Sequence, residues 1–85
     1  MTISRYVVYV LECKNGALYT GITTDLRRRF AEHQNGTGAR YTRANPPKRI
    51  IYSKKLKTRS AASKREAEIK SWPRERKLEM IAAHA

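Results

Sequence analysis

The fold is decided near the start of the chain, by the stretch YVVYVLECKNGALYTGI at residues 6–22. Residues 6–11 and 18–22 are rich in β-branched and aromatic side chains, which pack well on a pleated surface, so each segment predicts a strand. Lys14-Asn15-Gly16 between them is a turn signal. The stretch therefore predicts a β-hairpin.

The length of the loop decides which side chains of this hairpin share a face. A two-residue loop puts Tyr9 and Tyr19 on opposite faces, because strand side chains alternate. A three-residue loop at 14–16 makes the two phenols diagonal neighbours on one face. Gly16 then takes the left-handed bulge position, and Gly21, opposite Tyr9, leaves room for a water or a phosphate. If both tyrosines serve one site, the loop has three residues.

Farther along, the sequence predicts helices and one more strand. The expected elements are a helix to about Gln34, a basic loop at 39–48, a strand at 49–56 and helices at 60–70 and 73–84. Thr23 or Thr24 is expected to cap the first helix, with Asp25 in its first turn. The order β-β-α-β-α-α defines one α+β domain over residues 1–85, a small three-stranded antiparallel sheet flanked by helices.

Charge is the strongest signal in the composition. Nineteen Lys and Arg against seven Asp and Glu give the 85-residue chain a formal charge of +12, and nucleic acid is the natural partner of such a surface. Simple solubility and attraction to acidic membranes are the alternative explanations. No apolar run approaches the ~20 residues of a membrane span, and the stretch that ends at Glu12 lacks a signal-peptide cleavage site. Cys13, the single cysteine, excludes a disulfide-stapled domain and predicts a cytoplasmic location.

Two tripeptides in the hairpin resemble a family signature. Val8-Tyr9-Val10, followed ten positions later by Tyr19-Thr20-Gly21, is similar to the paired tripeptides that name the GIY-YIG nucleases. Residues 19–33 continue the family pattern, which has an arginine and then a histidine or tyrosine on the first helix, and residues 62–70 resemble the family's glutamate-bearing helix. The resemblance extends from Tyr6 to about Ile81, and it is closest to small bacterial proteins that consist of this domain alone.

The sequence departs from the family pattern at two places. Val8 stands where the first tripeptide has a glycine, and a strand accommodates valine well. Many members also carry a late Asn or Gln, where this chain has Lys77 and Leu78. We expect Lys77 to contact phosphate instead.

The resemblance implies a phosphodiesterase that uses one metal ion. It assigns Tyr9 and Tyr19 as the paired tyrosines, Arg29 as the phosphate-binding arginine, His33 as its partner one helical turn later, and Glu66 as the metal ligand. The residue types agree with these roles. A planar guanidinium binds two phosphate oxygens and stays charged. Mg²⁺, or Mn²⁺ in its place, often uses a single protein carboxylate together with waters and substrate phosphate.

The position of Glu66 agrees with a metal ligand. Ala62, Glu66 and Ile69 fall on one stripe of their predicted helix, which places this carboxylate among inward-facing residues. A lone inward carboxylate is costly unless a cation meets it. Glu68 is expected nearer the solvent, beside Lys64.

The mechanism that these roles suggest is attack of water on a phosphodiester. One tyrosine, Tyr9 by preference, would orient and deprotonate the water, although the choice between the two phenols stays open. A free phenol has a pKa near 10, so it needs positive charge nearby to act as a base at neutral pH. Arg29 would stabilise charge on the phosphoryl group, and the metal on Glu66 would neutralise the leaving oxygen. Tyr19 and His33 would position the water and the phosphate.

Each of these residues also has a purely structural interpretation. Tyr9 and Tyr19 are ordinary strand aromatics in that case. His33 is then a surface residue near the C-terminal end of its helix, and Glu66 pairs with Lys70 one turn later.

Further side chains are expected to bind the substrate backbone: Arg27, Arg28, Arg40, Tyr41, Arg43, Lys54 and Lys77. Tyr41 would stack on an exposed base, which favours single strands or flaps. The sequence as a whole predicts a metal-dependent endonuclease with low sequence specificity, acting on DNA rather than RNA and including single-stranded or branched DNA, with targeting supplied by a partner protein. A non-catalytic nucleic-acid-binding module and a small ribosome-associated protein are the alternatives.

Overall fold

The apolar segment at the start of the chain forms the central strand of the sheet. In the computed structural model, which describes residues 5–84, β1 (Tyr6–Cys13) pairs with β2 (Leu18–Thr23) on one side and with β3 (Pro47–Leu56) on the other. Both pairings are antiparallel, and the strand order is β2-β1-β3. β1 is apolar on both faces because each of its faces is covered. The predicted three-stranded sheet is confirmed.

The β1–β2 hairpin has the three-residue loop. Cys13 N donates to Ala17 O at 2.8 Å across a loop in which Gly16 has φ of +87°. Tyr9 then lies opposite Gly21 in the register. Tyr9 and Tyr19 consequently share a face, with ring centroids 6.5 Å apart.

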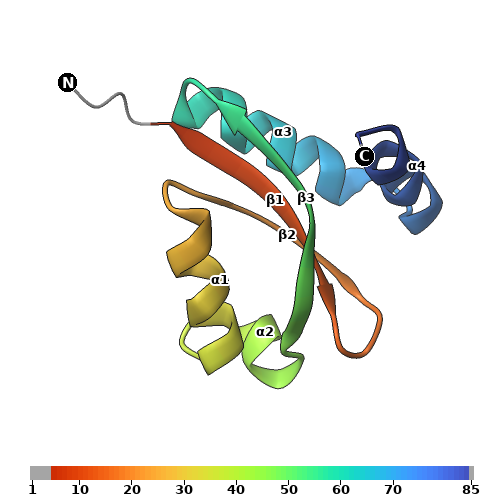
Figure 1. The fold of residues 1–85 in the computed structure, drawn as a ribbon. Helices are drawn as coiled ribbons and strands as arrows, with labels where there is room; N and C mark the ends of the chain where they lie inside the picture. Colours follow the sequence, from red (N-terminus) through yellow and green to blue (C-terminus); the bar gives the residue numbers. More distant parts are fainter. Residues whose placement is uncertain (1–4, 85) are drawn as a thin grey trace.

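Helices cover both faces of the sheet (Figure 1). One face, which includes Val8 and Val10, packs on buried residues of α3 (Arg59–Ser71), and α4 (Arg74–His84) follows on that side. The opposite face, which includes Tyr9, meets α1 (Leu26–Asn35), and the short α2 (Arg40–Ala44) lies next to α1. The sheet separates the two helical layers, and β2 and β3 are its edge strands.

The start of α1 corrects one prediction. Asp25, and neither Thr23 nor Thr24, is the cap, since its carboxylate accepts the N–H of Arg28 at 3.1 Å. Thr23 supports the cap indirectly, because its hydroxyl oxygen accepts the N–H of Asp25 at 3.1 Å.

The predicted basic loop at 39–48 is also wrong in part. Residues 40–44 form α2, which the hydroxyl of Thr42 supports by donating to Ala39 O at 3.0 Å. Strand β3 begins two residues earlier than predicted, at Pro47; a proline fits there because the first residue of a strand needs no ladder donor. Helix α3 begins at Arg59 because the side chain of Thr58 caps Ala61 N.

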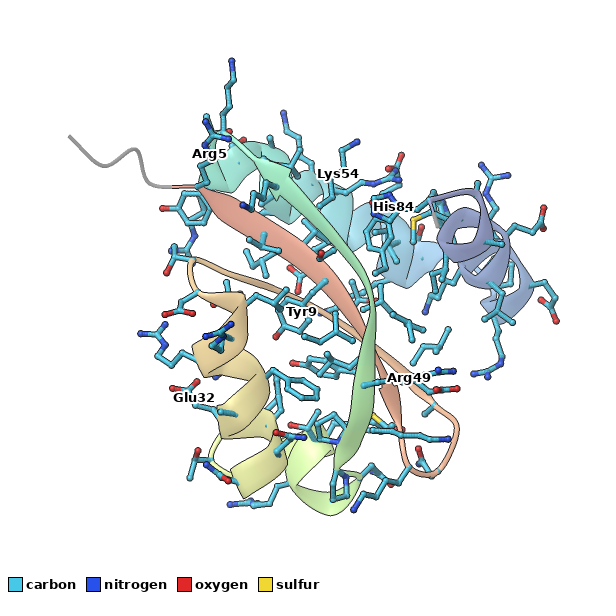
Figure 2. All side chains as sticks on the ribbon, in the orientation of Figure 1. Arg5, Tyr9, Glu32, Arg49, Lys54 and His84 are labelled. Carbon is cyan, nitrogen blue, oxygen red and sulfur yellow. The ribbon has the colours of Figure 1, made fainter. Side chains whose placement is uncertain are left out.

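Figure 2 shows Tyr9 between the sheet and α1, where it is buried. Arg49 and Lys54 are exposed on β3, and Glu32 is half-buried on α1. No helix within residues 5–84 combines the length and the apolar character that crossing a membrane requires.

Candidate active site

A buried hydrogen bond joins β1 to α1 at the centre of the candidate site. The Tyr9 phenol oxygen lies 2.8 Å from His33 Nε2. Tyr9 is 1% exposed and His33 is 0% exposed, so the interpretation of His33 as a helix-surface residue is wrong. His33 faces inward because it follows Leu26 and Phe30 on the side of α1 that meets the sheet.

The hydrogen bonds around His33 fix its tautomer. His33 Nδ1 lies 2.6 Å from Thr42 Oγ1, and that hydroxyl donates to Ala39 O at 3.0 Å. A threonine hydroxyl has one proton, which is committed to Ala39, so Thr42 accepts the proton on Nδ1. Nε2 is therefore unprotonated and accepts the proton of Tyr9.

Two glycines allow this pair to pack closely. A Cβ on Gly21 would lie 2.5 Å from the Tyr9 oxygen, and a Cβ on Gly38 would lie 2.6 Å from His33 Nδ1. The space above Gly21 was expected to hold a water or a phosphate. It holds the phenol of Tyr9 instead, because the tyrosine lies across the glycine toward α1.

Burial shifts the pKa values of both partners toward their neutral forms. Burial raises the pKa of Tyr9 to about 12; the guanidinium of Arg29 opposes this rise, and the charges of Tyr19 and Glu66 add to it. Burial, followed by the positive charge of Arg29, lowers the pKa of His33 below its usual value. At neutral pH Tyr9 therefore keeps its proton, and His33 is an uncharged acceptor.

A row of aromatic rings leads from this pair to the surface. Tyr19 packs edge-on against His33, with ring centroids 5.1 Å apart. On its other side Tyr19 is nearly parallel to Tyr41, with centroids 6.3 Å apart and an angle of 13° between the planes. Tyr41 is 42% exposed.

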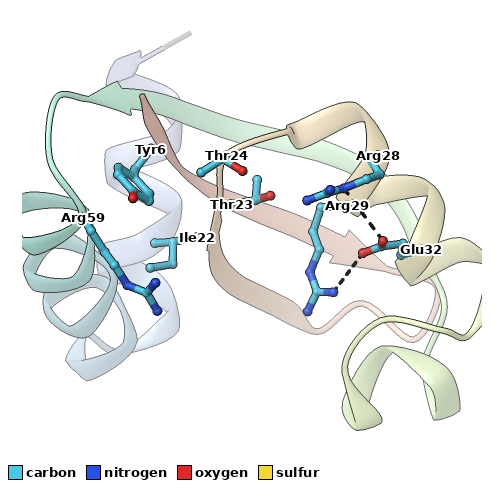
Figure 3. A pocket seen from close by; sticks show the side chains of 8 residues that line it. All are labelled: Tyr6, Ile22, Thr23, Thr24, Arg28, Arg29, Glu32 and Arg59. Carbon is cyan, nitrogen blue, oxygen red and sulfur yellow. Dashed lines mark hydrogen bonds and ion pairs between the residues drawn. The ribbon is translucent and has the colours of Figure 1, made fainter. Parts of the chain in front are cut away.

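Three arginines surround a hollow of about 250 Å³ beside the edge strand (Figure 3). Arg28 and Arg29 come from α1, and Arg59 comes from the first turn of α3 on the other side of β2. Glu32 holds the guanidinium of Arg29 at 3.0 Å. Three cations facing one carboxylate favour binding of an anion such as phosphate.

Glu66 lies on α3 and is partly buried. Its side chain is 23% exposed, and its carboxylate lies 3.1 Å from Lys70 Nζ. Its negative charge adds a small part to the raised pKa of Tyr9. The pair with Lys70, which the sequence allowed, is present. Glu68 is exposed, as expected, and pairs with Arg65.

Glu66, as a single carboxylate, fits a metal ion that is held partly by substrate. Within residues 5–84 no three His, Cys, Asp or Glu side chains gather at one point, so these residues do not build a complete metal cage. Mg²⁺ needs no such cage, because one carboxylate, waters and a substrate phosphate suffice. In the described structure the Glu66 carboxylate is paired with Lys70, so a metal ion there would have to displace the ammonium group.

The other predicted binding residues are distributed around the molecule. Lys77 lies with Tyr41 on a second hollow beside β2. Arg27 is exposed on α1, Arg40 and Arg43 are exposed on α2, and Lys54 is exposed on β3, the opposite edge strand. The binding roles of these four stay predictions.

Sequence reasoning missed three residues that the site uses: Thr42, Gly38 and Arg59. Thr42 lies among Arg40, Tyr41 and Arg43, and Arg59 ends the basic run that begins at Lys54, so the predicted binding roles fell on those neighbours. Nothing in the sequence around Gly38 marks it as a partner of His33, because that contact depends on how α1 and α2 pack.

The α+β frame and the hairpin with both tyrosines on one face place the chain in one nuclease superfamily. The family model described as GIY-YIG catalytic domain matches residues 5–79. The chain belongs to this family.

Several relatives are small proteins named UPF0213. One from Xanthomonas axonopodis pv. citri is 51% identical over 76 residues, covering 89% of this chain and 74% of that protein. Another, from Staphylococcus saprophyticus, is 40% identical over 80 residues, covering 94% of this chain and 98% of that protein. The solution NMR structure of the UPF0213 protein from Bacillus halodurans superposes with a TM-score of 0.62 at 38% identity, covering 93% of this chain and 84% of that chain. This chain therefore shares its fold with that UPF0213 protein.

Proposed function

We propose that this protein is a metal-dependent endonuclease that hydrolyses phosphodiester bonds in DNA with low sequence specificity. The observation that carries the proposal is the 2.8 Å hydrogen bond between the Tyr9 phenol and His33 Nε2. This hydrogen bond gives Tyr9, which the family pattern assigns to the reaction centre, a neighbouring proton acceptor in His33.

The hydrogen bond provides a route around the high pKa of Tyr9. A phenol with a pKa of about 12 is not ionised at neutral pH. When the attacking water gives a proton to the phenol oxygen, the phenol passes its own proton to His33 Nε2, so no free phenolate has to form. Thr42 holds His33 in the tautomer that can accept this proton. Tyr9 is thus the tyrosine that we assign as general base.

Arg29 and Glu66 are assigned to the phosphate. The guanidinium of Arg29, oriented by Glu32, would bind the non-bridging oxygens as negative charge grows on them. Glu66 would hold Mg²⁺ or Mn²⁺, which supplies positive charge for the leaving oxygen when it is bound. Tyr19 packs against His33 and would keep the imidazole in place.

The charge of the chain supports a nucleic-acid substrate. A formal charge of +12 over 85 residues attracts the sugar–phosphate backbone whatever its sequence, so we infer low specificity and targeting by a partner protein. We place the protein in the cytoplasm, because Cys13 is a buried free thiol and suits a reducing compartment.

A non-catalytic nucleic-acid-binding module is the second candidate. The observation that favours it is the ion pair between Lys70 and Glu66 at 3.1 Å, which places a lysine at the position proposed for the metal.

Cleavage assays with paired variants decide between the two candidates. The full chain is incubated with end-labelled single-stranded, duplex and branched DNA and with RNA, in Mg²⁺ or Mn²⁺ and in EDTA. We expect metal-dependent cleavage of DNA that Glu66→Gln abolishes and that Tyr9→Phe slows about 10²–10⁴-fold. Glu68→Gln is the matched control, because Glu68 is an exposed glutamate of the same helix, and it should cut normally. DNA binding without cleavage in any metal would establish the binding module.

A further inference from the structure

A second hollow lies at the other end of β2 from the three arginines. Its volume is about 310 Å³, and its lining comes from four elements: Leu18, Tyr19 and Thr20 of β2, Tyr41 of α2, Lys70 of α3 and Lys77 of α4. Tyr19 also packs on His33, so the hollow and the candidate active site share this side chain.

Tyr41 offers an aromatic face to this hollow. Its ring is nearly parallel to that of Tyr19, at 13° and 6.3 Å, and it is 42% exposed. A flat ring laid on its open side would continue the row that begins at His33. Nucleobases stack on such rings with little regard to sequence.

Thr20 supplies a second, independent sign that a ligand belongs here. Thr20 is only 3% exposed, and its Oγ1 is buried without a hydrogen-bond partner among the described residues. A buried hydroxyl without a partner is costly. The edge of a nucleobase carries both donors and acceptors, so it can satisfy this group.

Two lysines add the charge that a nucleotide requires. Lys70 and Lys77 enter the hollow from two different helices. Lys70 also pairs with Glu66, which places it between the hollow and the residue proposed to bind metal. A hydrophobic peptide would bring no negative charge to these two ammonium groups, whereas a DNA strand brings a phosphate on each side of its base.

We infer that this hollow is a nucleobase-binding subsite that takes one unpaired base of the DNA strand whose phosphodiester is held at Arg29. The inference rests on the proposed function and narrows it to a substrate class. A base inside a duplex is stacked on both sides and cannot reach Tyr41, so the substrate is a single strand or the unpaired arm of a branched molecule.

The test measures binding in EDTA, so its outcome does not depend on cleavage. Fluorescence anisotropy follows a labelled short single strand bound to the wild-type chain and to variants. Tyr41→Ala is expected to weaken binding roughly 5- to 150-fold, the range for loss of one stacked base, and Tyr41→Phe to bind as wild type does. The control is Ile50→Ala, since Ile50 is 37% exposed on the opposite edge strand. Equal affinity of Tyr41→Ala and Ile50→Ala would overturn the subsite.

Abasic and duplex ligands separate base stacking from backbone binding. An abasic position scanned through the strand should weaken wild-type binding at one place, and should cost Tyr41→Ala nothing there. On a fully paired duplex the two proteins should bind alike. An equal loss for wild type and Tyr41→Ala at every abasic position, or an equally large effect of Tyr41→Ala on the duplex, would show that Tyr41 contacts the backbone.

Thr20→Val gives a readout that a structural role would not produce. Valine keeps the shape and removes the unpartnered hydroxyl, so the midpoint of thermal unfolding should rise while single-strand binding weakens several-fold. A rise in stability with unchanged binding would remove Thr20 from the subsite.

Discussion

A methyl group added to Gly21 tests the close approach on which the Tyr9–His33 pair depends. The new Cβ in Gly21→Ala would lie 2.5 Å from the Tyr9 oxygen and 2.7 Å from Cζ, whereas ordinary contact begins at 3.4 Å. Tyr9 is 1% exposed, so the phenol has little room to retreat. The 2.8 Å bond to His33 must lengthen, or the strands must separate.

The expected loss of stability follows from these contacts. Forcing an extra methyl group into a filled core costs about 1–3 kcal/mol, and disturbing a buried hydrogen bond adds about 1–2 kcal/mol. The usual preference of a strand for alanine over glycine returns only about 0.5–1 kcal/mol. We therefore expect Gly21→Ala to lower the free energy of unfolding by about 2–4 kcal/mol and the unfolding midpoint by on the order of 10–20 °C.

We expect the cleavage rate of Gly21→Ala to fall by more than its lower stability explains. A displacement of about 1 Å at the reacting group costs about 100-fold in rate. Circular dichroism melts and urea titrations give the stability, and cleavage is measured well below both midpoints. Gly16→Ala is the control, because Gly16 has φ of +87° with no atom within 4 Å of the added Cβ. It should lose about 1 kcal/mol through backbone strain and cut normally. If Gly21→Ala is as stable and as active as wild type, the packing of Tyr9 described above is wrong.

Three further outcomes are expected. Because the pKa of His33 is lower in the folded than in the unfolded state, the contribution of His33 to stability is complete above the unfolded pKa of about 6.5 and is lost as the pH falls through the folded pKa. The free energy of unfolding from urea titrations between about pH 5 and 7 should therefore change more steeply with pH for wild type than for His33→Gln. Parallel slopes would contradict this. Lys70→Met removes the cation beside Glu66 and should tighten Mn²⁺ binding several-fold by calorimetry, whereas weaker binding would argue against Glu66 as a ligand. Arg59→Ala should reduce the slope of log affinity against log salt by about one, and an unchanged slope would show that Arg59 does not contact phosphate.

The register of the hairpin could be predicted because it depends on local rules. Alternation along a strand leaves two choices for Tyr9 and Tyr19, and the need for a shared face selects one loop length. The structure has that loop, with Gly16 in the left-handed conformation.

The support of His33 by α2 could not be predicted from the sequence. A five-residue helix is too short to show a periodic pattern, so residues 40–44 resembled a loop. The 2.6 Å contact between His33 and Thr42 depends on tertiary packing, and so does the position of Arg59 across the edge strand from Arg29. Local signals specify the elements, whereas the convergence of side chains follows from how the layers stack.

Helix α3 both completes the core of the sheet and carries Glu66. Its buried Ala62 and Ile69 cover the face of the sheet that holds Val8 and Val10, and Glu66 lies between them on the same helix. A growing polypeptide that has not yet released this helix from the ribosome has neither a closed core nor the carboxylate that we propose as the metal ligand. Under that proposal, cleavage activity and completion of the fold appear at the same stage of synthesis.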